Sequence, residues 1–308
     1  MHAYNIEMLH QSIGEGDPRG DGWAFGLPPG ISPAQWPLDP NNGYPLNHGF
    51  TIRLPEDYRV HGPDIVALSF FAVAFDHNDG MPLTAPRVRA FFDEVDPQKP
   101  SDPFLVPFWE ARQGEHPRLH RMKDILDLEY AVILLTEKEF NGPFTWPPRF
   151  DGNPHLVEVP TPAWMDHGSA SAFWDASYIM GPMPPEDYFV YKQLGGIPDP
   201  GLAFNRAIRI TTRNEDPNAG VAPDEFGDNG YQREYYWEGG VVETENYRLH
   251  KWVKSHLPNH IGGTMRPIQG FPDFSPYHLG FEEYFGGYNF GGGNAQLDFK
   301  DMKFDWAQ

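Results

Sequence analysis

The stretch Ile65-Val-Ala-Leu-Ser-Phe-Phe-Ala-Val-Ala-Phe75 is an almost unbroken apolar run. Runs of this kind, rich in β-branched and aromatic residues, are typical of strands that are buried on both faces of a sheet. The eleven residues therefore predict a central strand. A central strand needs a partner on each side, so the same sheet must draw further strands from other parts of the chain.

Shorter apolar runs supply those partners. The 33 prolines and 32 glycines are spread along the whole chain, which favours many short elements and few long helices. We therefore predict an α+β fold, a mostly antiparallel sheet with a few short covering helices. The other predicted strands are Phe50–Leu54, Glu129–Thr136, Tyr188–Lys192, Ala203–Thr211 and Asn294–Phe299.

Two segments have helical patterns. Ala85–Val95 follows Thr84, a candidate N-cap, and has Pro86 at its first helical position. Thr244–Leu257 is stopped by Pro258. We expect both helices to cover the sheet within a single domain, residues 1–308, that carries an irregular middle insertion at about 96–200.

Composition narrows the function classes. The formal net charge of -20 repels nucleic acid and anionic lipid and favours basic partners, although acidity can also serve solubility alone. The absence of cysteine excludes disulfides, thiolate nucleophiles and cysteine-ligated metals. No run of 18 apolar residues and no secretory signal is present, so we expect a cytoplasmic protein with no membrane and no nucleic-acid partner.

Two distant groups of motifs resemble one family. Near the start lie Gly26-Leu-Pro-Pro-Gly-Ile-Ser-Pro-Ala-Gln-Trp-Pro-Leu38 and Gly43-Tyr-Pro-Leu46, and near the end His260-Ile-Gly-Gly263 precedes Gln269-Gly-Phe-Pro272. Together they resemble the YwqG-like family of bacterial proteins of unknown function. The resemblance implies a mixed α and β fold with extensive antiparallel sheet, as one unit or as two similar halves, and implies no chemistry.

The chain departs from the family pattern before its last strand. The segment Tyr288-Asn-Phe-Gly-Gly-Gly293 stands where the family often has a turn with an aspartate. The paired glycines Gly262 and Gly263 fit a left-handed turn with a close backbone approach, and Gln269 belongs to the same signature. We expect this turn to be structural, because it lacks the donor array of a phosphate-binding loop.

No motif assigns catalysis. His116 with His120, and His256 with His260, have the spacing of metal ligands on a helix, but Pro117 and Pro258 interrupt both pairs. The oxygen-rich segments at 76–80 and 224–230 lack the ligand order of a calcium loop and are typical of turns. No Gly-x-Ser-x-Gly motif is present. We therefore predict no catalytic residue, no metal and no cofactor.

The segment 214–238 is the candidate partner-binding surface. It interleaves seven carboxylates with five aromatic residues, a mixture that can anchor and steer a basic protein. A solvated acidic loop that leads into a strand with core-facing aromatics explains the same pattern. The predicted contact residues are Glu215, Asp216, Asp224, Glu225, Asp228, Tyr231, Glu234 and Tyr235.

These observations predict a non-catalytic cytoplasmic binding protein. The specific hypothesis is an immunity protein that neutralises a cognate bacterial toxin, such as a basic nuclease effector, by direct protein-protein binding. Acidic, cysteine-free proteins of mixed fold commonly accompany toxins of that kind. The alternatives are a small-molecule-binding protein, whose aromatic residues would line a pocket, and an uncharacterised hydrolase.

Overall fold

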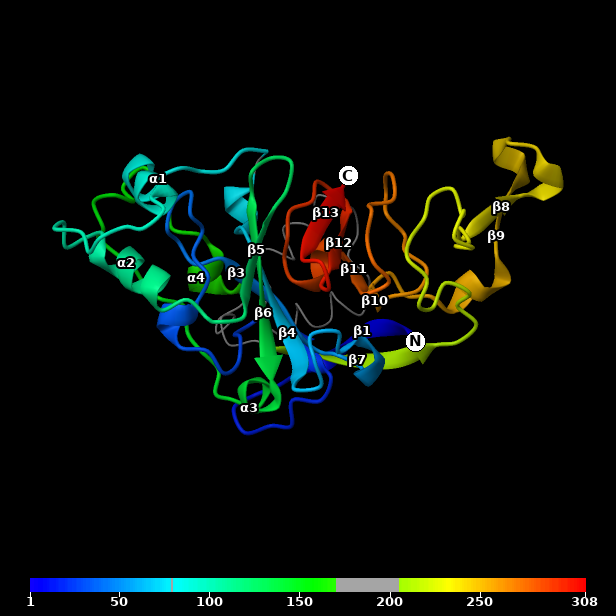
Figure 1. The fold of residues 1–308 in the computed structure, drawn as a ribbon, viewed down its shortest axis with the longest axis horizontal. Helices are drawn as coiled ribbons and strands as arrows, with labels where there is room; N and C mark the ends of the chain where they lie inside the picture. Colours follow the sequence, from blue (N-terminus) through cyan, green and yellow to red (C-terminus); the bar gives the residue numbers. More distant parts are fainter. Residues whose placement is uncertain (79, 170–204) are drawn as a thin grey trace.

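The computed structural model describes residues 1–78, 80–169 and 205–308. In these ranges eleven strands form one antiparallel sheet, in the order β13-β12-β11-β10-β1-β7-β2-β3-β4-β6-β5 (Figure 1). Two further strands, β8 (Tyr235–Trp237) and β9 (Tyr247–Leu249), pair only with each other. The strands of the large sheet are β1 (Ala3–Ser12), β2 (Gly22–Ala24), β3 (Asn47–Arg53), β4 (Ile65–Ala72), β5 (Leu119–Lys123), β6 (Glu129–Thr136), β7 (Arg206–Arg213), β10 (His260–Ile261), β11 (His278–Glu282), β12 (Asn294–Asp298) and β13 (Lys303–Ala307).

The central strand is confirmed. Every residue of β4 is buried, and β4 lies between β3 and β6, as an apolar run without alternation requires. The strand ends at Ala72, three residues before the predicted end, and a short 3-10 turn begins at Phe75. The predicted strands at 129–136 and 294–299 match β6 and β12, whereas Tyr188–Lys192 lies outside the described residues.

Both faces of the sheet are covered by apolar side chains. On one face Phe70 packs against Tyr130 and Phe304, and on the other Phe71 packs against Trp36. The sheet curls so that its outermost strands β5 and β13 approach one another. The Nε1 of Trp306 in β13 donates to Asp124, directly after β5, at 2.6 Å.

The helices are few and short, as expected, but one prediction is wrong. In the described residues they are α1 (Pro86–Asp93), α2 (Val106–Gln113), α3 (Glu137–Phe140) and α4 (Trp164–His167). The predicted helix at 244–257 is instead a 3-10 turn, strand β9 and a second 3-10 turn, Lys251–Ser255. Val253 is the only buried apolar side chain of the segment, too little for an amphipathic helix, so pairing with β8 prevails over the helical pattern.

The middle of the chain is part of the sheet. Within the predicted insertion at 96–200, β6 pairs with β4 and β5 pairs with β6, so residues 119–136 are integral to the fold. The overall assignment as mostly antiparallel sheet with few helices holds, and the similarity of two halves stays a prediction. None of the helices in the described ranges is long and apolar enough to cross a membrane.

Candidate functional site

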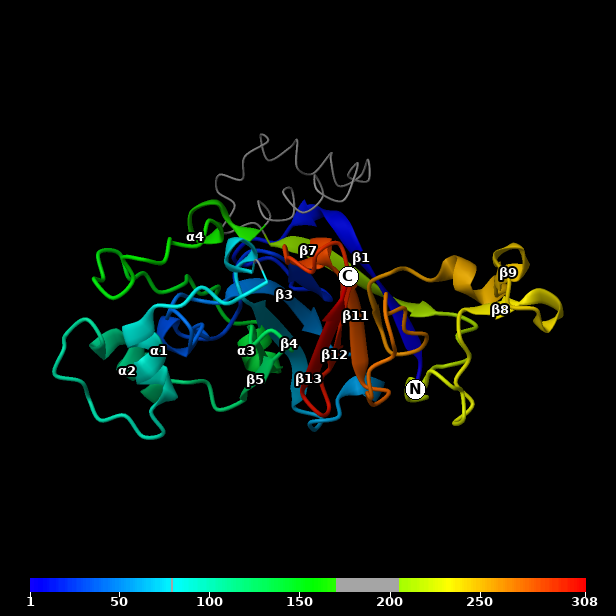
Figure 2. The ribbon, with the colours of Figure 1, turned by 90° about the horizontal axis from the view of Figure 1, so that it is seen from above.

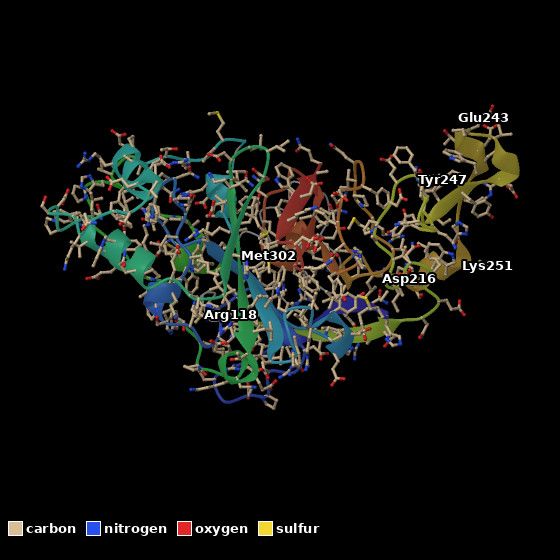
Figure 3. All side chains as sticks on the ribbon, in the orientation of Figure 1. Arg118, Asp216, Glu243, Tyr247, Lys251 and Met302 are labelled. Atoms are coloured by element: carbon tan, nitrogen blue, oxygen red, sulfur yellow. The ribbon has the colours of Figure 1, made fainter. Side chains whose placement is uncertain are left out.

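The most prominent surface feature is a projecting hairpin, residues 235–249, which we call the arm. It comprises β8, β9 and the tip between them, and Figures 1 and 2 show it extending away from the large sheet. At the tip, Gly239 and Gly240 have φ values of 70° and 74°, the left-handed region that glycine enters without steric cost. In Figure 3 the labelled residues Glu243 and Tyr247 lie on the arm, far from Arg118 of the sheet region.

The arm is held together by its own aromatic rings. Tyr235 stacks on Tyr247 with ring centroids 4.9 Å apart, and Trp237 meets Tyr247 edge-on at 5.8 Å. The large sheet shares no strand pairing with the arm in the described residues. Several apolar side chains therefore stay open to solvent: Tyr236 is 44% exposed and Val242 is 72% exposed. Exposed apolar groups gathered on one element make the arm a candidate interaction site.

Carboxylates surround these apolar groups. Glu238, Glu243 and Glu245 are exposed on the arm. The adjacent loop, residues 224–230, presents Glu225 and Asp228 beside Phe226, which is 84% exposed.

Arg233 joins the loop to the arm. Its Nη2 donates to the carbonyl oxygen of Glu225 at 2.9 Å, and its Nη1 donates to the Tyr235 hydroxyl at 2.6 Å. We call the arm and the loop together the acidic-aromatic surface.

The predicted contact residues divide into exposed and buried groups. The prediction is wrong for Asp216 and Tyr231, because their side chains are buried and cannot touch a partner. Asp224 closes its own loop by accepting from the amides of Phe226 and Asn229, which lowers its pKa. Glu215, Glu225 and Asp228 are exposed, Tyr235 is half-buried, and Glu234 is half-buried in an ion pair with Arg266.

Asp216 is the centre of a buried polar cluster beneath the arm. Its carboxylate accepts from the amide of Thr264 at 2.9 Å and from the Thr264 hydroxyl at 2.8 Å. The Nη1 of Arg213 lies 3.3 Å away, and both side chains are fully buried. Tyr231 completes the arrangement, since its hydroxyl accepts from the amide of Met265 at 2.6 Å. The cluster fixes the chain that follows β10.

The paired glycines belong to this cluster. Gly262 and Gly263 have φ values of 58° and 72°, which few other residues adopt. A Cβ at Gly262 would overlap the Tyr58 hydroxyl, and a Cβ at Gly263 would overlap the Asp216 carboxylate. The Nε2 of Gln269 donates to the carbonyl oxygen of Gln308 at 2.8 Å, which ties the same segment to the end of the chain. These contacts are structural.

The base of the arm is tied to the sheet by Asn5 of β1 and by Arg213. The Asn5 side chain donates to the carbonyl oxygen of Ser255 and accepts from the amide of Leu257, each at 2.9 Å. Arg213 Nη2 donates to the carbonyl oxygen of Leu257 at 2.8 Å. No sequence motif marked Asn5 or Arg213, because their roles depend on strands far apart in the chain.

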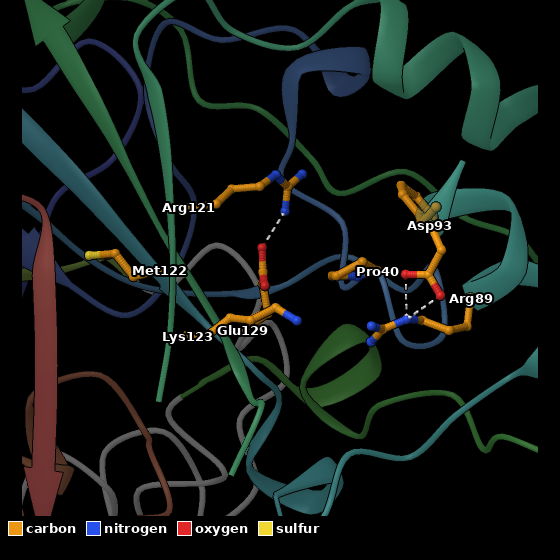
Figure 4. Close-up of a pocket in the computed structure, with 8 residues that line it drawn as sticks. Pro40, Arg89, Asp93, Arg121, Met122, Lys123 and Glu129 are labelled. Carbon is orange, nitrogen blue, oxygen red and sulfur yellow. Dashed lines mark hydrogen bonds and ion pairs between the residues drawn. The ribbon is translucent and has the colours of Figure 1, made fainter. Parts of the chain in front are cut away.

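A second candidate site is a pocket of about 350 Å³ between α1, β5 and β6 (Figure 4). Two ion pairs form its polar part: Arg121 contacts Glu129 at 3.0 Å, and Arg89 contacts Asp93 at 2.8 Å. Burial raises the pKa of Glu129, although Arg121 opposes this effect. The lining residues are Pro40, Arg89, Phe92, Asp93, Arg121, Met122, Lys123 and Glu129.

The histidines do not form a metal centre in the described ranges. No group of three or more His, Asp or Glu side chains is arranged there to hold an ion. His116 instead lies 3.3 Å from Glu139, and His260 bonds through Nδ1 to the Pro258 carbonyl at 2.8 Å.

Comparisons of the chain with protein-family models, with curated proteins and with solved structures gave no match. The resemblance to the YwqG-like family therefore stays a prediction that rests on the motifs alone. The two motifs nonetheless have clear structural roles. Gly43 of the first lies against Phe108 and Val88, and the glycine pair of the second lies against Tyr58 and Asp216.

Proposed function

We propose that the protein is a non-catalytic binding protein that recognises a basic protein through the acidic-aromatic surface. The observation that supports this most is the arm, which holds apolar side chains in solvent at a distance from the hydrophobic core. Surface aromatics of this kind supply most of the binding energy when a partner pocket encloses them. The surrounding carboxylates favour partners rich in lysine and arginine.

The class of partner that we propose is a cognate bacterial toxin, in the first place a basic nuclease, which this protein would neutralise in the cytoplasm as an immunity protein. A nuclease holds phosphate with lysine and arginine side chains, and the carboxylates of the acidic-aromatic surface can satisfy the same groups. The net charge of -20 would also accelerate encounter with a cationic protein at low ionic strength.

Toxin neutralisation is tested by co-expression. A candidate basic toxin, captured with this protein from cells of the native host, is expressed with and without the protein, and surviving colonies are counted. We expect full protection from the intact protein and little protection when Tyr236, Val242 and Tyr247 are replaced by serine. Equal protection by both forms would place the contact elsewhere.

The charge contribution has a matched control. The double variant Glu225→Lys, Asp228→Lys should slow association with the captured partner by roughly tenfold at low salt, and the difference should shrink as salt is added. The variant Glu94→Lys, Asp96→Lys changes the net charge equally at exposed positions near α1, at the other end of the molecule. Similar association rates for the two variants, measured by surface plasmon resonance, would refute a local role for the loop.

The pocket supports a second candidate function, small-molecule binding. Its volume lies within the range of ligand sites, and it combines guanidinium groups with the apolar side chains of Phe92 and Met122. A thermal-shift screen of small anionic metabolites would test it, with Arg121→Gln as the site variant and the surface variant Arg209→Gln as the control. A ligand that stabilises both variants equally does not bind in the pocket.

A further inference from the structure

The junction between the arm and the sheet, residues 255–257, contains a buried histidine that no hydrogen bond satisfies. The His256 side chain is fully buried, and neither ring nitrogen has a hydrogen-bond partner among the described residues. The flanking residues are firmly tied, since Asn5 bonds both Ser255 and Leu257. The imidazole therefore lies inside the junction without contributing a polar contact to it.

The surroundings of His256 cannot accommodate a second positive charge well. Asp216 Oδ2 lies 3.9 Å from His256 Nε2, too far for a hydrogen bond. That carboxylate already accepts from Arg213, Thr264 and the amide of Asn218. The other ionisable groups that act on His256 or on its neighbours Arg213 and Asp216 include Arg266, His260, Tyr231, His278 and Tyr58. Arg266 is itself paired with Glu234.

Arg213 carries the positive charge that a protonated His256 would face. Its guanidinium bonds Leu257, Asn5 and Asp216, so the main cation of the cluster is also the group that fastens the junction. Trp252 covers His256 on the arm side, with ring centroids 5.4 Å apart. An imidazolium at this position would repel Arg213 and could regain water only if the junction opened.

We propose that His256 makes the junction acid-sensitive: a proton on its imidazole opens residues 255–257 and releases the arm from its fixed orientation, while the large sheet stays folded. The consequence for partner recognition rests on the proposed function. Arg233 still joins the arm to the loop at 224–230, but with the junction open the ion pair of Glu234 with Arg266 alone no longer holds this surface in one orientation. Acid would then weaken partner binding before it unfolds the protein.

The size of the effect follows from protonation. Burial, and then the charge of Arg213, lower the pKa of His256 to about 4. An opened junction exposes the imidazole to water, where its pKa returns to about 6.5. Linkage between the two states raises the opening equilibrium by roughly 30-fold between pH 7.5 and pH 5.

Hydrogen exchange on the full chain tests this without a partner. Amides of the junction, such as those of His256 and Leu257, should show the roughly 30-fold increase in opening after correction for intrinsic exchange. At pH 5 the junction amides should still exchange through a smaller opening free energy than the amides of β6, which open only with the whole fold. In His256→Phe the increase at the junction should fall below about threefold, because no proton can bind there. His120→Phe, which removes a histidine of β5, should behave like the natural sequence.

The outcomes are distinct. An increase that persists in His256→Phe, or no increase in the natural sequence, refutes the proposal, as do equal opening free energies at the junction and in β6. If His256→Phe does not fold, His256→Met replaces it, since an unbranched side chain adapts to the same space. Failure to bind any basic partner, with acid-dependent opening intact, would refute the proposed function and leave the junction proposal standing.

Discussion

Gly263 shows at the scale of single residues how a short motif is used. Its backbone is left-handed, and the space above its Cα is filled by Asp216 and by Ala3 of β1. Glycine is therefore needed twice, for the conformation and for the close approach. The neighbouring Arg213–Asp216 pair is buried, so any shift of Asp216 leaves a charge without its partners.

The variant Gly263→Ala should lower the free energy of unfolding by about 2–4 kcal/mol, because the new Cβ displaces a buried carboxylate. Gly152→Ala is the control, since Gly152 has a similar φ of 75° with nothing within 4 Å of the added carbon. We expect it to cost about 1 kcal/mol. Urea denaturation followed by circular dichroism measures both values, and equal losses would show that conformation alone requires Gly263.

The residue scale is also where the sequence was least informative about the site. Gly262 and Gly263 were predicted as a turn, because glycine pairs have a local conformational meaning. Asp216 and Tyr231 are predicted on the surface because the sequence of an acidic segment does not show which of its side chains are buried. Their burial depends on Thr264 and Met265, more than 30 positions along the chain, and no local pattern encodes such partners.

At the scale of elements, the arm is separable from the sheet. Its two ends meet, because the amide of His250 donates to the carbonyl oxygen of Glu234 at 2.9 Å. The contacts that hold β8 to β9 are internal stacking and pairing. An element of this kind contributes little to the stability of the body from which it extends.

Replacing residues 235–249 by Gly-Gly should therefore leave the melting temperature within about 4 °C of the original value. The same variant should lose binding to the proposed basic partner, because the exposed aromatic residues are gone. Differential scanning calorimetry and a binding measurement on one preparation give both results. A collapse of the melting transition would instead make the arm a structural part of the fold.

Strands were predicted better than helices for a physical reason. Strands buried on both faces, such as β4 and most of β6, are largely apolar, so their sequences are distinctive. The segment 244–257 instead carries Tyr247 and Leu249 on either side of Arg248, and its exposed residues match a strand as well as a helix. Only the pairing of β9 with β8 decides that the segment forms a strand, and β8 is not part of the segment.

At the scale of the whole molecule, buried neutral histidines govern the response to acid. Burial lowers the pKa of His48 to about 3 and that of His278 to about 4, and it also lowers the pKa of His260. Their pKa values in the unfolded chain are about 6.5, so between pH 6.5 and pH 4 the unfolded chain binds more protons. The contribution of these histidines to stability is thus present above pH 6.5 and is lost as the pH falls.

We expect the free energy of unfolding to decrease by about 1–2 kcal/mol per buried histidine between pH 7 and pH 5. Urea titrations at half-unit pH intervals measure the slope. Replacing His48 by glutamine should reduce that slope, and replacing the exposed His2 should not. A flat stability profile over this interval would mean that the folded chain binds as many protons as the unfolded chain, which contradicts this prediction.

The approach of β5 to β13 has a consequence for how the chain behaves in a crowded solution. Outermost strands usually offer rows of unpaired amides and carbonyls to other molecules, which is how sheets grow into fibrils. Here the hydrogen bond from Trp306 to Asp124 brings the two edge strands of the large sheet close together, edge to edge. Self-association through that sheet is discouraged, and a concentrated cell extract should keep the folded chain dispersed.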